Sequence, residues 1–130
     1  MKPLKIHQFD PVIYPRLVWI VNGGTPEDIR KEFFERDGEE LNLEPEFKNS
    51  HACVSDVTFG EDKMIGVLVW IIDKPRGCKD IAHESVHVAN KIFRDCGIDM
   101  HYDHDEHYAY LIGWVADCIE QVVKNKFKDR

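Results

Sequence analysis

The fold is decided by residues 81–93, which read IAHESVHVANKIF. Apolar side chains recur in this stretch at the three- and four-residue spacing of an α-helix. We expect the helix to start near residues 78–80 and to end at Gly97. Its predicted buried stripe consists of Ala82, Val86, Ala89 and Phe93.

Two strands are predicted before this helix. Residues 52–59 mix small, polar and apolar side chains, whereas residues 66–72 are apolar on both faces. The loop between them, residues 60–63, suits a hairpin connection. A strand that is apolar on both faces belongs in the centre of a sheet, and a more polar strand belongs near its edge. The second strand is therefore expected inside the sheet and the first near its rim.

The N-terminal third of the chain predicts one strand and one helix. Residues 16–21 form the strand, and a turn follows at 22–24. Thr25 is suited to be the N-cap of a helix whose first residue is a proline. The apolar face of that helix would contain Ile29, Phe33 and Phe34, and the helix would end at residues 37–38. Residues 39–50 are polar and acidic, and we expect a solvated loop there.

A polar connector over residues 99–105 leads to a last helix over residues 106–126. One face of this helix is predicted to contain Ala109, Ile112, Ala116, Ile119 and Val123. The order strand, helix, strand, strand, helix, helix indicates a single α+β domain over residues 1–130, with its helices packed on one face of a small mixed sheet.

Composition excludes several classes of function. The 130 residues are 43% hydrophobic and carry a net charge of −7, from 17 Lys and Arg against 24 Asp and Glu. Phosphate binding relies on clustered cations, so nucleic acid is not an expected partner. No apolar segment follows Met1, and the longest apolar run, residues 67–72, is too short for a bilayer. Four scattered cysteines without a C-x-x-C pair are expected to be reduced thiols. We therefore expect a cytoplasmic protein with no membrane partner.

His83, Glu84 and His87 form the strongest chemical motif, H-E-x-x-H. Residues four apart lie on the same face of a helix, so both imidazoles can reach one tetrahedral Zn²⁺ ion. Glu84 lies at the rim of that face, where it can reach a metal-bound water as general base without ligating the metal. The motif therefore predicts a zinc hydrolase in which His83 and His87 are metal ligands and Glu84 is catalytic.

A catalytic zinc site usually has a third protein ligand. The metzincin pattern would supply Gly and His three and six residues after the second histidine, but Asn90 and Phe93 occupy those positions. Glu106 is our choice for the third ligand. It opens the last helix in phase with Ala109, Tyr110 and Gly113, which we expect to face the rest of the domain, and Gly113 would allow close approach of the two helices. Asp105 is the alternative ligand.

The two histidines, the intervening glutamate and a glutamate on the following helix resemble the gluzincin group of zinc metallopeptidases. Residues 9–16 and the block DEHYAYL at 105–111 also resemble short zincin-like proteins of bacteria and their phages. The resemblance implies a minimal zincin-like fold and hydrolysis of a peptide or protein substrate. It also implies that the edge strand 52–59 binds an extended peptide by strand addition. Substitutes for the family's transition-state-stabilising His or Tyr would be Tyr108, Tyr110, His104 or His107.

Two other interpretations remain open from the sequence. The chain could be a catalytically silent zinc-binding interaction module, or its two helix histidines could be satisfied in a polar core without metal. Glu84 favours the enzyme, because a structural zinc site needs no neighbouring carboxylate and normally closes with a fourth protein ligand. His7 and His51 are expected at surface or strand positions, and the tryptophans as core anchors. Substrate identity and oligomeric state are left open.

Overall fold

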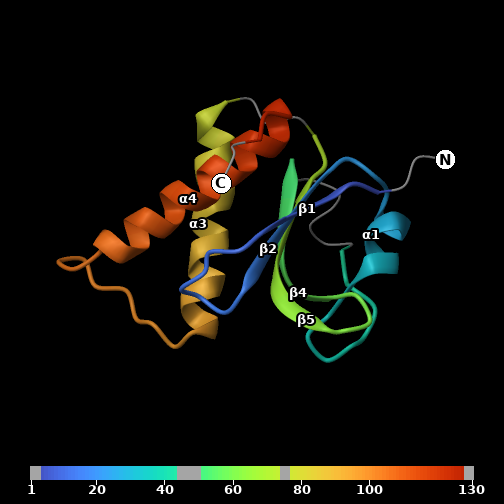
Figure 1. The fold of residues 1–130 in the computed structure, drawn as a ribbon, viewed down its shortest axis with the longest axis horizontal. Coiled ribbons are helices and arrows are strands. Elements are labelled where there is room, and N and C mark those ends of the chain that lie inside the picture. Colours follow the sequence, from blue (N-terminus) through green and yellow to red (C-terminus); the bar gives the residue numbers. More distant parts are fainter. Residues whose placement is uncertain (1–3, 44–50, 74–76, 128–130) are drawn as a thin grey trace.

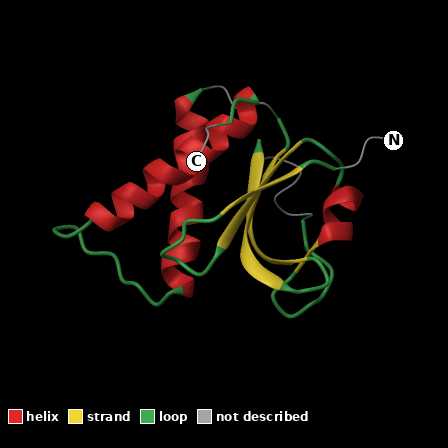
Figure 2. Cartoon of the chain, viewed as in Figure 1, coloured by secondary structure: helices red, strands yellow, loops and turns green. Residues whose placement is uncertain are grey.

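The computed structural model describes residues 4–43, 51–73 and 77–127 (Figure 1). These residues form a five-stranded sheet and three helices, coloured by type in Figure 2. The elements are β1 (Ile6–Phe9), β2 (Leu17–Asn22), α1 (Pro26–Glu32), β3 (Phe33–Phe34), β4 (Ala52–Phe59), β5 (Met64–Ile71), α3 (Cys78–Asp95) and α4 (Glu106–Lys124). The predicted α+β class is confirmed. No helix among the described residues is long and apolar enough to cross a membrane.

The strands lie in the order β1-β2-β5-β4-β3. β2 and β5 are parallel, whereas the other pairs are antiparallel, so the sheet is mixed. β5 is central, as its apolar faces predicted. β4 pairs along its whole length with β5, but on its other side only Thr58 and Phe59 pair with a strand, the short β3. Residues 52–57 therefore form an open strand edge within the described part of the chain.

The sheet is covered on both faces (Figure 1). α3 and α4 pack on one face against side chains of β2 and β5, whereas α1 and residues 41–43 pack on the other. The expectation that the helices share one face is therefore correct for α3 and α4 and wrong for α1. The second face needs this cover because it carries Trp19 and Trp70, both fully buried as predicted.

α1 begins as predicted and ends earlier. Thr25 forms a capping box with Asp28, and Pro26 is the first helical residue. The helix stops at Glu32, because Phe33 takes an extended conformation and pairs with Phe59. Its ring packs against Trp19 and Phe59. The aromatic pair Phe33–Phe34 thus belongs to a strand, in which Phe33 is fully buried.

The loop predicted over residues 39–50 is partly ordered into the fold. Glu40 forms an isolated bridge with Phe34, and Leu41 and Leu43 are fully buried beneath the second face of the sheet. The expectation of a solvated segment is therefore wrong for Leu41 and Leu43, whereas Glu39, Glu40 and Asn42 are exposed as expected. Residues 44–50 lie outside the described residues.

The two long helices exist as predicted, but their buried stripes are rotated. α3 buries Ser85, Val88, Ala89, Ile92 and Phe93, and α4 buries Tyr108, Leu111, Val115, Cys118, Ile119 and Val122. Ala82 and Val86 of the predicted α3 stripe are exposed instead, as is Ala109 of α4. The stripe of α3 is centred on the residues that meet the sheet and α4 together, and this leaves Ala82 and Val86 beside a cleft.

Candidate metal centre

A cleft of about 750 Å³ lies between the first half of α3 and the start of β4. Its lining from the strand side is residues 51–54. Its lining from the helix side is Lys79, Asp80, Ala82, His83, Glu84, Val86, His87 and Lys91. The cleft exists because β4 is open along this edge and α3 turns an unburied face toward it. The sequence motif and the predicted substrate strand therefore border the same cavity.

The imidazoles of His83 and His87 converge at their outer nitrogens. The two Nε2 atoms are 3.2 Å apart, and the rings meet edge to face with centroids 4.8 Å apart and an interplanar angle of 77°. Both side chains are exposed to the cleft. One helical turn separates the two residues, and this spacing is what brings the rings together on one face.

This geometry fits a tetrahedral zinc ion. Two nitrogens bound to one zinc at about 2.0–2.1 Å and at the tetrahedral angle lie roughly 3.4 Å apart. The observed separation of 3.2 Å is close to this value, and it also places the two rings in hydrogen-bond contact. A ligand atom from each of His83, Glu84 and His87 lies within 4.8 Å of the others. The donor set of two imidazoles and a nearby carboxylate is one that zinc prefers.

Glu84 is half-buried beside the histidine pair. Burial raises the pKa of its carboxyl group above the ordinary value of 4.5; His83 opposes this shift, Asp80 adds to it, and His51 opposes it. A carboxylate whose pKa is moved toward neutrality holds a proton more readily, and that suits a general base working near pH 7. Glu84 therefore lies beside the histidine pair, and its pKa is shifted in the direction that favours a general base.

The structure does not bring Glu106, the predicted third ligand, into the histidine cluster. Among the described residues, the group able to hold a metal is His83, Glu84 and His87. Glu106 is exposed at the first position of α4. The side of α4 on which it was expected to pack is itself exposed, including Tyr110, and a Cβ added at Gly113 would meet no atom within 4 Å. The predicted close approach of the two helices at Gly113 is therefore wrong.

The other residues considered from the sequence also lie outside the cleft. Asp105 is the N-cap residue of α4, although its side chain makes no capping hydrogen bond. The Tyr108 hydroxyl donates to Asn90 Oδ1 at 2.5 Å, and the His107 ring stacks on Phe93. Tyr110 and His104 are exposed. None of these residues is among those that line the cleft in the described part of the chain.

His51 is a cleft residue that sequence reasoning missed, because it was assigned to an ordinary surface or strand position. It immediately precedes β4, and its carbonyl accepts hydrogen bonds from the backbone N–H groups of Ile72 and Asp73. Its Nδ1 lies 3.8 Å from a carboxylate oxygen of Asp73. His51 lines the cleft together with Glu84 and influences the pKa of that residue. No spacing along the sequence indicates this, since 32 positions separate the two residues.

No known protein family, curated protein or solved structure is significantly similar to this chain. Of the predicted resemblance to zincins, the histidine–glutamate–histidine cluster is the part that the structure supports.

Proposed function

We propose that this protein is a zinc-dependent metallopeptidase whose active site is the cleft between α3 and β4. The observation that carries the proposal is the convergence of the His83 and His87 Nε2 atoms to 3.2 Å beside the half-buried carboxylate of Glu84. A structural zinc site would close with four protein ligands. Among the described residues, the cluster offers two imidazole ligands with the Glu84 carboxylate beside them, so positions on a bound zinc remain for water and substrate.

Glu84 acts as the general base in this proposal. When bound, zinc lowers the pKa of a coordinated water and polarises a substrate carbonyl. Glu84 accepts the proton of the attacking water and then delivers it to the leaving amine, so the carboxylate is regenerated in each turnover. Its partial burial raises the pKa of the carboxyl group, and this direction of shift favours both proton transfers.

The open edge of β4 supports a peptide as substrate. Among the described residues, no strand pairs with this side of β4 along residues 52–57, and residues 52–54 line the cleft beside the histidine cluster. An extended peptide can pair with such an edge by main-chain hydrogen bonds. Pairing there would lay the peptide along the cleft and bring one of its carbonyl groups to the site.

Glu106 remains our proposal for the third ligand. Glu84 is needed as the base, so a third protein donor must come from elsewhere, and the first turn of α4 is fastened to the second half of α3 by Tyr108 and His107. The exposed Glu106 side chain can change rotamer at little cost. We expect Glu106→Ala to lower zinc affinity at least tenfold in competition with a chromophoric chelator. Asp105→Ala is the matched control and should leave affinity unchanged; the reverse result would assign the ligand to Asp105.

The decisive experiment for catalysis is Glu84→Gln. The amide keeps the size of the side chain and one acceptor oxygen but cannot take a proton. We expect this variant to bind one zinc per chain like the wild type and to lose hydrolysis of an unstructured protein such as casein and of a mixed peptide library. Undiminished cleavage by the variant would remove Glu84 from the mechanism. Zinc binding by the wild type without cleavage of any library peptide would favour the silent zinc-binding module instead.

A further inference from the structure

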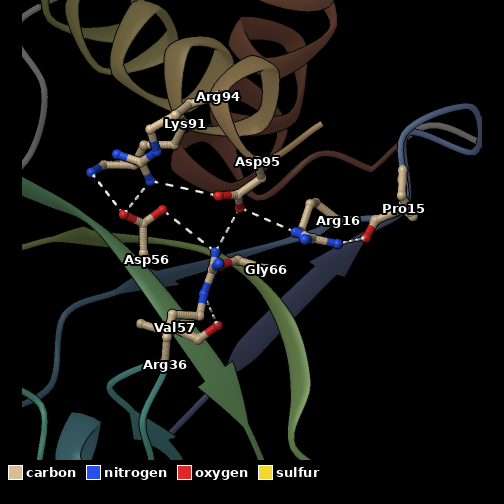
Figure 3. Close-up of polar contacts among 9 residues, drawn as sticks. All are labelled: Pro15, Arg16, Arg36, Asp56, Val57, Gly66, Lys91, Arg94 and Asp95. Atoms are coloured by element: carbon tan, nitrogen blue, oxygen red, sulfur yellow. Dashed lines mark hydrogen bonds and ion pairs between the residues drawn. The ribbon is translucent and has the colours of Figure 1, made fainter. Parts of the chain in front are cut away.

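A network of charged side chains joins the end of α3 to β4 and to the segments around β2 and β3 (Figure 3). Two carboxylates lie at its centre, Asp56 on β4 and Asp95 at the last position of α3. Four cations surround them: Arg16, Arg36, Lys91 and Arg94. Four positive and two negative charges leave a local surplus of two positive charges, in a chain whose net charge is −7.

The network has a structural half. Asp95 accepts hydrogen bonds from Arg16 Nε at 3.1 Å and from Arg36 Nη2 at 2.9 Å. Arg36 also donates to the carbonyl groups of Val57 and Gly66, and Arg16 donates to that of Pro15. Their side chains are less than a third exposed. These two arginines therefore fix α3 to the sheet, and their charges are held by Asp95 and Asp56.

The other two cations are the surplus. Arg94 Nη2 lies 2.6 Å from Asp56 Oδ2, and Lys91 Nζ lies 3.4 Å from the same oxygen. The two cations therefore share one acceptor atom. The Arg94 side chain is 60% exposed. Exposed ion pairs of this kind contribute little to stability. Lys91 and Asp56 are each 24% exposed, and Arg36 contacts the same carboxylate at 3.4 Å, so three cations share the single negative charge of Asp56.

Lys91 connects this surplus charge to the candidate metal centre. It follows His87 by one helical turn on the same face of α3 and lines the same cleft. Four residues of helix advance about 6 Å along the axis. An extended peptide advances about 3.3 Å per residue. A substrate that lies along the cleft would therefore pass Lys91 one or two residues away from the bond at the histidine pair.

We infer that the cleft selects peptides that carry a carboxylate one or two residues from the cleaved bond, with Lys91 and the neighbouring Arg94 as its binding site. The carboxylate can belong to an Asp or Glu side chain or to the C-terminus of the peptide. The position of the subsite relative to the bond rests on the proposed peptidase function, whereas the affinity for a carboxylate rests on the charge surplus alone.

The test uses one peptide library in two forms, with free and with amidated C-termini. The zinc-loaded wild type is incubated with each form, and the cleavage positions are read by mass spectrometry. In parallel, the immobilised Glu84→Gln protein retains library peptides without cutting them, and these are sequenced. We expect acidic residues at one or two positions from the cut, or free C-termini there, to be enriched about fivefold, the ratio that one solvent-exposed charge pair can supply. The enrichment should fall toward unity in 0.5 M salt.

Lys91→Met should abolish the enrichment while one zinc per chain is still bound. Lys79→Met is the matched control, since this lysine lines the same cleft one helical turn beyond His83, and it should leave the enrichment on the Lys91 side of the cut unchanged. If the wild type shows the enrichment with the free library but not with the amidated library, the subsite binds a C-terminal carboxylate. Equal cleavage of acidic and neutral peptides by the wild type, together with their equal retention by Glu84→Gln, would overturn the inference. Absence of zinc binding would instead contradict the proposed function, and the retention measurement would still report on Lys91.

Discussion

Asp95→Asn should be among the most destabilising polar substitutions in this protein. Asp95 Oδ2 accepts hydrogen bonds from two arginines, at 3.1 Å from Arg16 and 2.9 Å from Arg36, and its side chain is only 10% exposed. A hydrogen bond to a charged group contributes about 1.5–3 kcal/mol, and solvent reaches both arginines, so the lower part of that range applies to each. The amide retains one neutral acceptor. We therefore expect a loss of about 3 kcal/mol in the free energy of unfolding.

The measurement is urea denaturation followed by circular dichroism, with the slope of the transition compared between variants. Asp99→Asn is the matched control, because Asp99 is exposed in the connector between α3 and α4, and it should change stability by less than about 0.5 kcal/mol. A loss of about 3 kcal/mol corresponds to a decrease of roughly 10 °C in Tm for a domain of this size. A change for Asp95→Asn no larger than that for Asp99→Asn would refute the structural role of the network.

The pH dependence of the difference in unfolding free energy between wild type and Asp95→Asn provides a second check on the role of Asp95. Burial alone would raise the pKa of Asp95, but the hydrogen bonds and charges of Arg36 and Arg16 outweigh it and hold the pKa below the ordinary value of 3.8. Because the pKa of Asp95 is lower in the folded state, its ionised carboxylate stabilises the fold fully above the pKa of the unfolded chain. This stabilisation is lost as the pH falls through the pKa of the folded protein. The difference between wild type and Asp95→Asn should be constant from about pH 7 to 5 and should narrow below about pH 4. A difference that grew on acidification would contradict this assignment.

Two further substitutions test the packing that positions the site. Gly66→Ala should destabilise the fold by about 3 kcal/mol, since a Cβ there would clash with the Leu17 carbonyl oxygen and the Trp19 ring. Gly113→Ala, in open space on α4, should instead stabilise the fold by about 0.5–1 kcal/mol. Thermal denaturation measures both changes, and equal effects of the two substitutions would contradict the packing described for β5. Tyr108→Phe should lower the free energy of unfolding by about 1 kcal/mol through the lost hydrogen bond to Asn90. A double-mutant cycle with Asn90→Ala should give a coupling energy of similar size. Additive effects of the two substitutions would show that the bond contributes nothing.

Local sequence patterns predicted most of the fold. The N-cap at Thr25, the hairpin of β4 and β5, the central position of β5 and both long helices follow from residues close together in the chain. The patterns failed where partners distant in sequence decide the outcome. Phe33 leaves its helix to pair with Phe59 and pack on Trp19, and Leu41 is buried by the same face of the sheet. Such long-range packing overrides local propensity.

The candidate site divides in the same way. The His83–Glu84–His87 cluster is local, because one helical turn sets its geometry, and the sequence located it. The contribution of His51 to the cleft depends on how β4 lies beside α3, and the surplus charge at Lys91 depends on Asp56, an arrangement that no sequence spacing encodes. The position of Glu106 depends on the angle at which α4 crosses α3, and helical periodicity predicted its packing face wrongly.

Zinc stoichiometry tests the central claim most directly. The protein is purified with chelator, titrated with zinc, dialysed and analysed for metal, together with His83→Ala, His87→Ala and the control His101→Ala, which changes an exposed histidine of the connector. We predict one zinc per chain for the wild type and for His101→Ala, and a loss of binding of at least a hundredfold in either helix variant. Folded wild-type protein that retains no zinc, or helix variants that bind it as tightly as the wild type, would contradict a metal site at the two converging imidazoles.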